Sequence, residues 1–548
     1  MRRFWNALVI ASLLAAVLPI GSTQAASGWQ TTVDVSNQVA SSPFAAGGYP
    51  VADGATAPLP GTCRLGQYNA NRSESWIAVK PGTEDLVGTS KVFFEKYSTF
   101  YDFHLGSYTI PNGTPTSNSM VTGYECVSTG TQDMPPSWTN DTDPNVDFDT
   151  QGRAYQVTLP FNAYWTNLHP NGAIGAVYSD DLGKTWTTAN GGKYLEYLSK
   201  QSSFAADGFE DKQWVAVNHI VGSRYQDHVY AMWSVFNGNT SKIKIAVSRD
   251  RGQTFSAPTT ITKPQGTGPS NTYIYPSVDA NGDLYVALAS FPACCYSPVT
   301  MYVASSTDDG VTFSPFHLAA TTDAITTCCL PNTTFRDGII ENFAASPTYP
   351  GHLYLTWESW DGNQMDVKFS QSTNGGVTWT DEVVVNDNID GAASTDQFQP
   401  SVAAGPGGAV AIAFYDRRSA CPSDTSILAD HVGRSNFCID LSLQAFRDTG
   451  SGAAPVGSNV RMSNDSWDPE QPGQTIDGID QMACAAHSDP CTSNAFIGDY
   501  FGLAISDDNV YSLSVSTHYP STVIGDGGDH VYYQQQILGT VARSALGL

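Results

Sequence analysis

Five carboxylates recur at comparable places along the chain, each just before a segment that alternates apolar and polar residues. They are Glu74, Asp143, Asp211, Glu341 and Asp499. Two such groups can supply a proton donor and a base or nucleophile, and a cluster of them can bind Ca²⁺. An acid before a strand can instead simply cap loop N–H groups, so the residues alone leave these alternatives open.

Arginines stand near several of the same places. A guanidinium grips a carboxylate through two parallel hydrogen bonds. The arginines that qualify by position are Arg72, Arg336, Arg417 and Arg418, and the last two follow Tyr415 in the stretch "YDRR". The alternative for this stretch is a salt-bridge cluster that closes a strand.

Strands must position these residues. Seven segments read as a strand, a Gly-containing turn and a second strand, and they start near residues 75, 144, 213, 275, 342, 400 and 500. Each central pair is followed by an alternating strand, a turn and a short strand, which makes a four-stranded meander. Antiparallel units repeated in this way, without long amphipathic helices, predict an all-β fold, a β-propeller of seven blades, with six as the alternative.

The two ends of the chain predict closure of the ring. The seventh unit offers only three strands, the last of them "HVYYQQQI". The segment Trp29 to Asn37 is expected to supply the fourth strand and so to join the first blade to the last.

Strand parity predicts the face that could hold a site. In a meander the starts of the first strands lie on the face opposite the turns between third and fourth strands. All five carboxylates therefore belong at one mouth of the central channel. The ten cysteines fall in loops of the same face and predict disulfides. The expected pairs are Cys63 with Cys126, Cys294 or Cys295 with Cys328 or Cys329, Cys421 with Cys438, and Cys484 with Cys491.

A turn of the pattern S-x-[DN]-x-G-x-T-[WF] occurs four times. It starts at Ser179, Ser248, Ser306 and Ser372, at spacings of 58 to 69 residues. Its glycine can adopt φ > 0, and its Ser and Asp side chains can bond the turn's own backbone, so we predict a structural role. The four copies resemble the Asp boxes, or BNR repeats, of the sialidase-like superfamily, over nearly the whole chain after the first 26 residues.

The resemblance implies a propeller that is either a glycoside hydrolase or a non-catalytic carbohydrate- or protein-binding module. The leading interpretation is a hydrolase of exo-sialidase type. Where sialidases carry Arg-Ile-Pro, this chain reads "NRSESWIAV". The resemblance assigns roles by position: acid/base to Asp143 or Asp211, nucleophile pair to Glu341 and Tyr415, and substrate contacts to Arg72, Glu74, Arg336, Arg417, Arg418 and Asp499.

Charge and the N-terminal residues indicate the compartment. The formal charge is -26, which disfavours nucleic acid and anionic membranes as partners. A basic start, a short apolar run and a small-residue stretch predict a signal peptide over residues 1–26, followed by one propeller domain over residues 27–548. We therefore expect a secreted or periplasmic monomer without a membrane span that meets an extracellular glycan or glycoprotein. The sequence indicates no particular cofactor, although its carboxylates could bind Ca²⁺.

Overall fold

The fold is known from a computed structural model. Its described residues are 29, 31–41, 71–93, 103–121, 140–162, 171–198, 208–238, 240–262, 269–292, 297–325, 329–330, 333, 335–338, 341–388, 395–419, 438–468, 475, 478, 496–521 and 523–548. The predicted signal peptide lies outside them. Within these ranges no helix has both the length and the hydropathy that a bilayer span requires.

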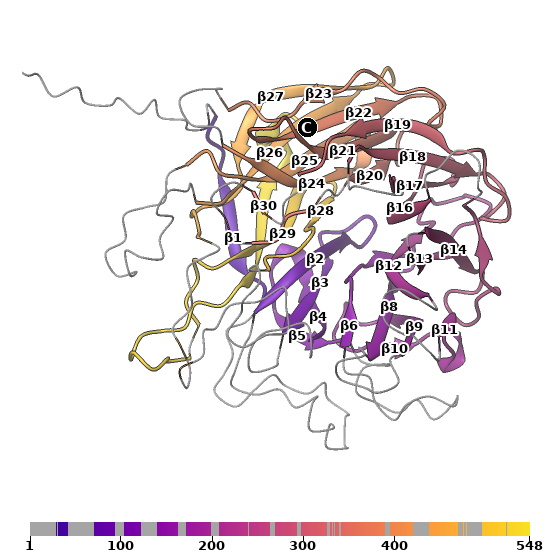
Figure 1. Cartoon of the computed structure of the whole chain (residues 1–548), viewed down its shortest axis with the longest axis horizontal. Helices are drawn as coiled ribbons and strands as arrows, with labels where there is room; N and C mark the ends of the chain where they lie inside the picture. The colour runs from indigo at the N-terminus through magenta and orange to yellow at the C-terminus, as the bar shows by residue number, and fades with distance from the viewer. Residues whose placement is uncertain are drawn as a thin grey trace, which may run out of the picture.

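Seven four-stranded antiparallel blades stand in a ring (Figure 1). The first strands surround the axis and contact one another from blade to blade. In blade order they are β2 (Arg72–Val79), β6 (Asn140–Thr142) with β7 (Asp147–Phe148), β12 (Phe209–Val217), β16 (Ser270–Val278), β20 (Asn342–Ala345), β24 (Gln397–Ala404) and β28 (Gly502–Ile505). The prediction of seven blades is confirmed, and the six-blade alternative is wrong.

The remaining strands continue each meander outward. Second strands are β3 (Leu86–Phe93), β8 (Ala154–Asn162), β13 (Val229–Asn237), β17 (Leu284–Phe291), β21 (Leu353–Trp360), β25 (Ala409–Asp416) and β29 (Asn509–Ser516). Third strands are β4 (Phe103–Ile110), β9 (Asn171–Ser179), β14 (Thr240–Ser248), β18 (Val299–Ser306), β22 (Met365–Ser372), β26 (Asp440–Asp448) and β30 (Gln535–Ala542). Rim strands are β5 (Ser117–Met120), β10 (Thr187–Thr188), β11 (Glu196–Leu198), β15 (Thr259–Thr260), β19 (His317–Thr322), β23 (Val383–Val384), β27 (Ala453–Arg461) and β1 (Val35–Val39).

Few helical segments accompany these strands. Among the described residues they are the 3₁₀ turns η2 (Pro111–Gly113), η3 (Asn190–Gly192) and η5 (Pro406–Gly408) and the short C-terminal helix α1 (Arg543–Leu546). Blades 1 and 2 are joined into one sheet by a parallel pairing of Phe103 with Asn140.

The N-terminal strand closes the ring, as predicted, but later in the chain than expected. β1 is the rim strand of blade 7, antiparallel to β30, with Val35 opposite Val541 and Val39 opposite Ile537 (Figure 1). The residues before it lie on blade 6 instead, where Trp29 donates its indole N–H to Ser442. The third strand of blade 7 likewise begins five residues later than "HVYYQQQI" suggested, at Gln535.

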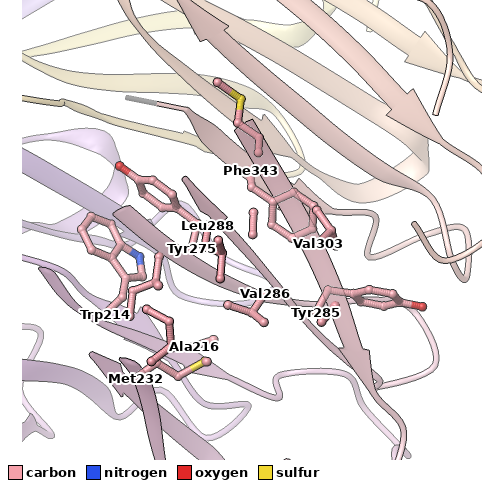
Figure 2. Close-up of a cluster of buried hydrophobic side chains, with 14 of the residues drawn as sticks. Trp214, Ala216, Met232, Tyr275, Tyr285, Val286, Leu288, Val303 and Phe343 are labelled. Atoms are coloured by element: carbon pink, nitrogen blue, oxygen red, sulfur yellow. The ribbon is translucent and has the colours of Figure 1, made fainter. Parts of the chain in front are cut away.

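Apolar side chains fill the space between neighbouring blades. The largest buried cluster runs through blades 3, 4 and 5. Figure 2 shows Trp214 and Tyr275 side by side at one end of this core and Tyr285 at the other. Trp233 and Trp357 are fully buried in the second strands. Close packing of this kind makes the ring stiff enough to hold side chains in fixed places at its axis.

The four repeated turns are structural, as predicted. In the first of them Ser179 Oγ accepts the Gly183 N–H at 2.9 Å, and Asp181 accepts the Thr185 N–H at 2.9 Å and the Thr185 hydroxyl at 2.6 Å. Gly183 has φ of 77°. The other three turns repeat the two bonds from backbone N–H groups.

The turns meet the hairpins of first and second strands on one face of the ring. Arg153, in such a hairpin, binds Asp180 beside the first turn, and Arg251 in the second turn binds Asp149. Five second strands add a tyrosine whose hydroxyl donates to a carboxylate on this face. The pairs are Tyr155–Asp149, Tyr230–Asp309, Tyr285–Asp279, Tyr354–Asp448 and Tyr511–Glu84. This face is thus a hydrogen-bonded seam between blades.

We predict that β1 contributes measurably to ring stability. A chain that begins at residue 42 should lose roughly 2–4 kcal/mol of unfolding free energy relative to one that begins at residue 29, because the β30 ladder loses its partner and Ala40 its burial. It should also self-associate through the exposed β30 edge. Thermal and urea unfolding of both forms measure this, and equal stability would rule the closure role out.

Candidate functional site

A backbone irregularity turns side chains toward the axis where the first strands begin. The pairing of first and second strands shifts register between Ser73 and Ser75, Asp211 and Trp214, Thr272 and Tyr275, and Phe398 and Ser401. Non-glycine residues with positive φ lie at these shifts and at the equivalent place in blade 2: Glu74 (47°), Asp143 (56°), Lys212 (47°), Tyr273 (50°) and Gln399 (46°). A non-glycine residue in this conformation is uncommon and strained, and such strain is concentrated at functional sites.

Blade 7 reaches the same axis through a glycine. Gly498 has φ of 115°, and a Cβ there would lie 2.8 Å from the Glu74 amide nitrogen. Only a glycine therefore lets the start of blade 7 approach blade 1 closely enough to bring Asp499 beside the residues of the other blades.

Seven charged side chains gather at this mouth, and we name them the mouth cluster. They are Glu74, Lys91, Asp143, Asp211, Lys212, Arg336 and Asp499. Lys212 lies at the centre, with Nζ 3.5 Å from Asp143 Oδ1 and 3.7 Å from Asp499 Oδ2. Its backbone N–H also donates to Asp143 (3.2 Å) and Asp211 (2.9 Å). One residue thus connects carboxylates from three blades.

Two further ion pairs complete the mouth cluster. Arg336 holds Asp499 with both arms of its guanidinium, at 3.2 Å from Nε and 2.5 Å from the second nitrogen. Lys91 lies 2.5 Å from Glu74. Arg336 is 38% exposed, whereas the side chains of Lys212 and Asp499 are each 8% exposed. Solvent therefore reaches the mouth at Arg336, and the side chains of Lys212 and Asp499 lie buried beneath it.

Aromatic rings close the channel below the charges. Trp214 makes edge contacts with Trp76 (4.7 Å between centroids), Tyr275 (4.8 Å) and Tyr500 (5.2 Å). The Lys212 ammonium lies 4.4 Å from the Tyr500 ring centre. These rings come from blades 1, 3, 4 and 7, so the floor is built by the same strand starts that carry the charges. Such a floor keeps the local dielectric low and strengthens every charge interaction above it.

Several polar atoms at this mouth are buried without a hydrogen-bond partner. They include both carboxyl oxygens of Glu341, Oδ2 of Asp337 and Oε1 of Gln399. Gln399 holds the other Asp337 oxygen at 3.4 Å. Buried polar atoms are almost always satisfied, so a group of exceptions in one place indicates a site that a polar ligand completes.

The carboxyl groups have strongly divergent pKa values. Burial, assisted by the charge of Asp143, raises the pKa of Asp211 to about 7. Burial raises the pKa of Asp337 to about 8, although the Gln399 bond opposes it, and raises that of Glu341 well above its usual value. Burial would also raise the pKa of Asp499, but Arg336 and Lys212 outweigh it and hold that pKa below its usual range. Protonated and ionised carboxyls thus coexist near neutral pH.

The structure brings five of the predicted residues together and places the sixth at the floor. Glu74, Asp143, Asp211, Arg336 and Asp499 are all in the mouth cluster. Glu341 is fully buried, and its charge interacts with Lys212 and Tyr275.

The other four predicted residues lie elsewhere. Tyr415 is buried between blades 6 and 7, where its hydroxyl accepts the Val515 N–H at 3.0 Å and its ring packs on Phe501. It lines a small pocket between these blades, whose lining includes no residue of the mouth cluster. Arg72 is fully buried beside Tyr533.

The two arginines of "YDRR" form ion pairs at the end of β25. Arg417 binds Asp396 at 2.7 Å, and Arg418 binds Asp416 at 2.7 Å and Asp387 at 2.8 Å. Both side chains are buried. This arrangement matches the salt-bridge alternative for this stretch.

Sequence reasoning missed Lys212, Lys91, Asp337 and Tyr273. Lys212 had a signal, because a lysine inside the strand "EDKQWVAV" interrupts an apolar pattern next to Asp211. The bulge that turns it toward the axis has no such signal. Tyr273 lies under the same kind of bulge, with its ring centre 5.3 Å from Lys212 Nζ.

Two of the predictions from sequence concern a metal site and disulfides. Within the described ranges, no group of three or more His, Cys, Asp or Glu residues is arranged to hold a metal ion. Cys329 and Cys438 are each in a disulfide bond, and the cysteines predicted to pair with them lie outside the described residues. The other eight cysteines, and with them the predicted pairings, lie outside the described residues.

Comparison with known proteins identifies no family. No protein-family model matches the chain, and no curated protein matches it. The solved structures that resemble it include sialidases. Two of them are the phage phi92 endosialidase (TM-score 0.43, 9% identity, 86% of this chain and 67% of that chain) and the Hadza microbial sialidase Hz136 (TM-score 0.39, 14% identity, 84% of this chain and 77% of that chain). A Dyadobacter fermentans protein of unknown function also matches (0.41, 11%, 87% and 96%). These similarities are too low to assign a family or an activity, and the propeller fold is established by the strand pairing.

We predict that Lys212→Met destabilises the protein, and more at pH 8 than at pH 5. Without the ammonium, the buried carboxylate of Asp499 loses one of the cations that hold its folded pKa low, so that pKa rises and the loss of stability grows as pH increases. The loss at pH 8 should be about 3–5 kcal/mol in urea unfolding. Lys368→Met, which breaks the exposed pair with Glu382, is the control and should cost less than about 1 kcal/mol at either pH. Equal losses at both pH values for Lys212→Met would contradict this account.

Proposed function

We propose that the chain is a glycoside hydrolase that acts at the channel mouth. The observation that carries this proposal is the divergence of carboxyl pKa values around buried polar atoms that lack partners. A glycosidase needs one carboxyl group that is protonated and another that is ionised on the two sides of the bond it cleaves. Asp211, with a pKa of about 7, suits the proton donor. Asp143, beside the Lys212 ammonium, suits the ionised partner.

The spacing of these two groups supports a particular mechanism. Both accept the N–H of Lys212, at 2.9 and 3.2 Å, so their bonded oxygens lie within about 6 Å of each other. Separations of about 5–5.5 Å are typical of retaining enzymes, and larger ones of inverting enzymes. Asp143 would then attack the anomeric carbon while Asp211 protonates the leaving oxygen, and water would later release the sugar.

Glu341 offers a second nucleophile. It was expected to act with Tyr415, but the tyrosine with which its charge interacts is Tyr275. A tyrosine can also form a covalent glycosyl intermediate when a neighbouring carboxylate takes its proton, and this route requires Glu341 to be ionised despite its raised pKa. Tyr275→Phe distinguishes the two routes, because it removes the hydroxyl and leaves the aromatic floor intact.

The exo-sialidase form of this function has less support than the general one. It requires several arginines around one substrate carboxylate. Of the arginines predicted for that task, Arg336 alone is in the mouth cluster. The proposal is therefore a glycoside hydrolase of an exported protein, acting on extracellular glycans, with non-catalytic glycan binding as the competing function.

We expect Asp211→Asn to lower kcat by about 10²–10⁴-fold on whichever aryl glycoside the protein hydrolyses, since a positioned general acid contributes that much. Activity of the unchanged protein should fall as pH rises above about 7, where Asp211 loses its proton, and this limb should vanish in Asp211→Asn. Asp180→Asn, on the opposite face, is the control. Glycan-array binding without turnover of any aryl glycoside would favour the non-catalytic alternative.

We further expect hydrolysis with retention of anomeric configuration. Two carboxyl oxygens within about 6 Å of each other favour direct attack by Asp143 over the wider spacing that accommodates a water molecule. Proton NMR of the first product anomer, recorded before mutarotation, measures the outcome. Inversion would exclude the assigned pair of carboxyl groups.

A further inference from the structure

The cations of the channel mouth are already occupied by carboxylates. Lys91 is bound to Glu74, Lys212 lies between Asp143 and Asp499, and Arg336 holds Asp499 in a two-armed pair. Asp499 is the carboxylate that faces two of them. The planar guanidinium edge that matches a carboxylate best is therefore filled by a group of the protein itself.

Carboxyl groups also outnumber cations at this mouth. Besides the four carboxyl groups of the mouth cluster, the carboxyl groups of Asp337 and Glu341 stand beside it, against three cations, so no cation there is left without an acid of the protein nearby. A ligand carboxylate would have to displace Asp499 from Arg336 or lie among these acids, and like charges brought together in this way oppose binding.

An uncharged sugar has no carboxylate that must compete with Asp499 for the cations. Its hydroxyls can donate to the unpartnered oxygens of Glu341, Asp337 and Gln399. The half-buried rings of Trp76 and Tyr273 provide apolar surface near the same strand starts. Satisfying buried acceptors in a water-poor site gives strong discrimination in favour of a ligand that carries the matching donors.

We propose that Asp499 determines substrate specificity: by occupying Arg336 and Lys212, it sets the channel mouth for uncharged sugars and excludes sugars that carry a carboxylate. This inference rests on the proposed action on glycans and names the substrate class of the same site. It also predicts a switch, because Asp499→Asn keeps the shape of the side chain and removes the carboxylate that both cations face, which a ligand carboxylate can then replace.

The test uses pairs of methyl glycosides and their uronates in the gluco, galacto and manno configurations, which differ only in the carboxylate. Binding to the full-length protein is measured by calorimetry or ligand-observed NMR. The unchanged protein should bind the neutral member of the best pair at least about tenfold more tightly. Asp499→Asn should shift this ratio at least about tenfold toward the uronate.

Two variants control the result. Asp180→Asn breaks a two-armed pair of the same kind with Arg153, at 2.7 and 2.8 Å, on the opposite face, and should leave the ratio unchanged. Arg336→Gln added to Asp499→Asn should abolish the gain for the uronate, because the receiving guanidinium is gone. Thermal unfolding of each variant shows whether the fold is kept, and an Asp499→Asn protein that fails to fold leaves the preference of the unchanged protein to decide.

The outcomes separate this inference from the proposed function. Neutral sugars bound in preference to uronates, but no glycoside hydrolysed, would refute the hydrolase and support the role of Asp499. Uronates bound as tightly as neutral sugars by the unchanged protein would overturn the inference, and so would a folded Asp499→Asn variant with an unaltered ratio. Binding of no sugar at all would overturn both.

Discussion

The left-handed backbone at the start of the first strands is the constraint on which the mouth cluster depends. A regular strand points alternate side chains to its two faces, and neither face is the axis. The bulges at these positions break that alternation and place Glu74, Lys212 and Tyr273 where the blades converge. Each such residue costs about 1–3 kcal/mol of strain, which persists only when the surroundings hold it in place. Five of the seven blades show it, so the ring geometry has to stabilise the strain.

That stabilisation comes from the rest of the ring. The seam of repeated turns and tyrosine–carboxylate bonds lies on the opposite face, and the interblade cores lie between the two faces. Nearly every polar group of the seam has a partner, whereas the mouth has a concentration of buried atoms without one. The stabilising seam and the channel mouth are thus separated by the length of a strand. This separation allows the protein to keep buried polar atoms without hydrogen-bond partners at the mouth and still remain folded.

Much of the fold could be predicted from the sequence because its signals are local. A glycine, a serine and an aspartate at fixed spacing make the same turn wherever they occur, and period-two alternation reveals a strand. The mouth carboxylates could be predicted for a similar reason, since an acid just before a strand needs only the strand to be placed. β1 was placed too early because Trp29 and Val35 belong to different blades, a partition that alternation does not reveal.

The predicted site residues that lie outside the mouth cluster were misplaced because the sequence does not reveal how far a residue lies from the channel axis. Strand parity correctly assigns the end of β25 to the mouth face, but a second strand stands one layer further out than a first strand. Tyr415, Arg417 and Arg418 therefore face blade 7 and the ends of neighbouring strands. Strand parity tells on which face of the ring a residue lies. Whether the residue is also close to the channel axis depends on the position of its strand within the blade, because only the first strands border the channel. Lys212 is the opposite case, because the sequence shows only one polar residue within a first strand. The bulge between Asp211 and Trp214 turns its side chain toward the axis, where it connects three blades at the centre of the site.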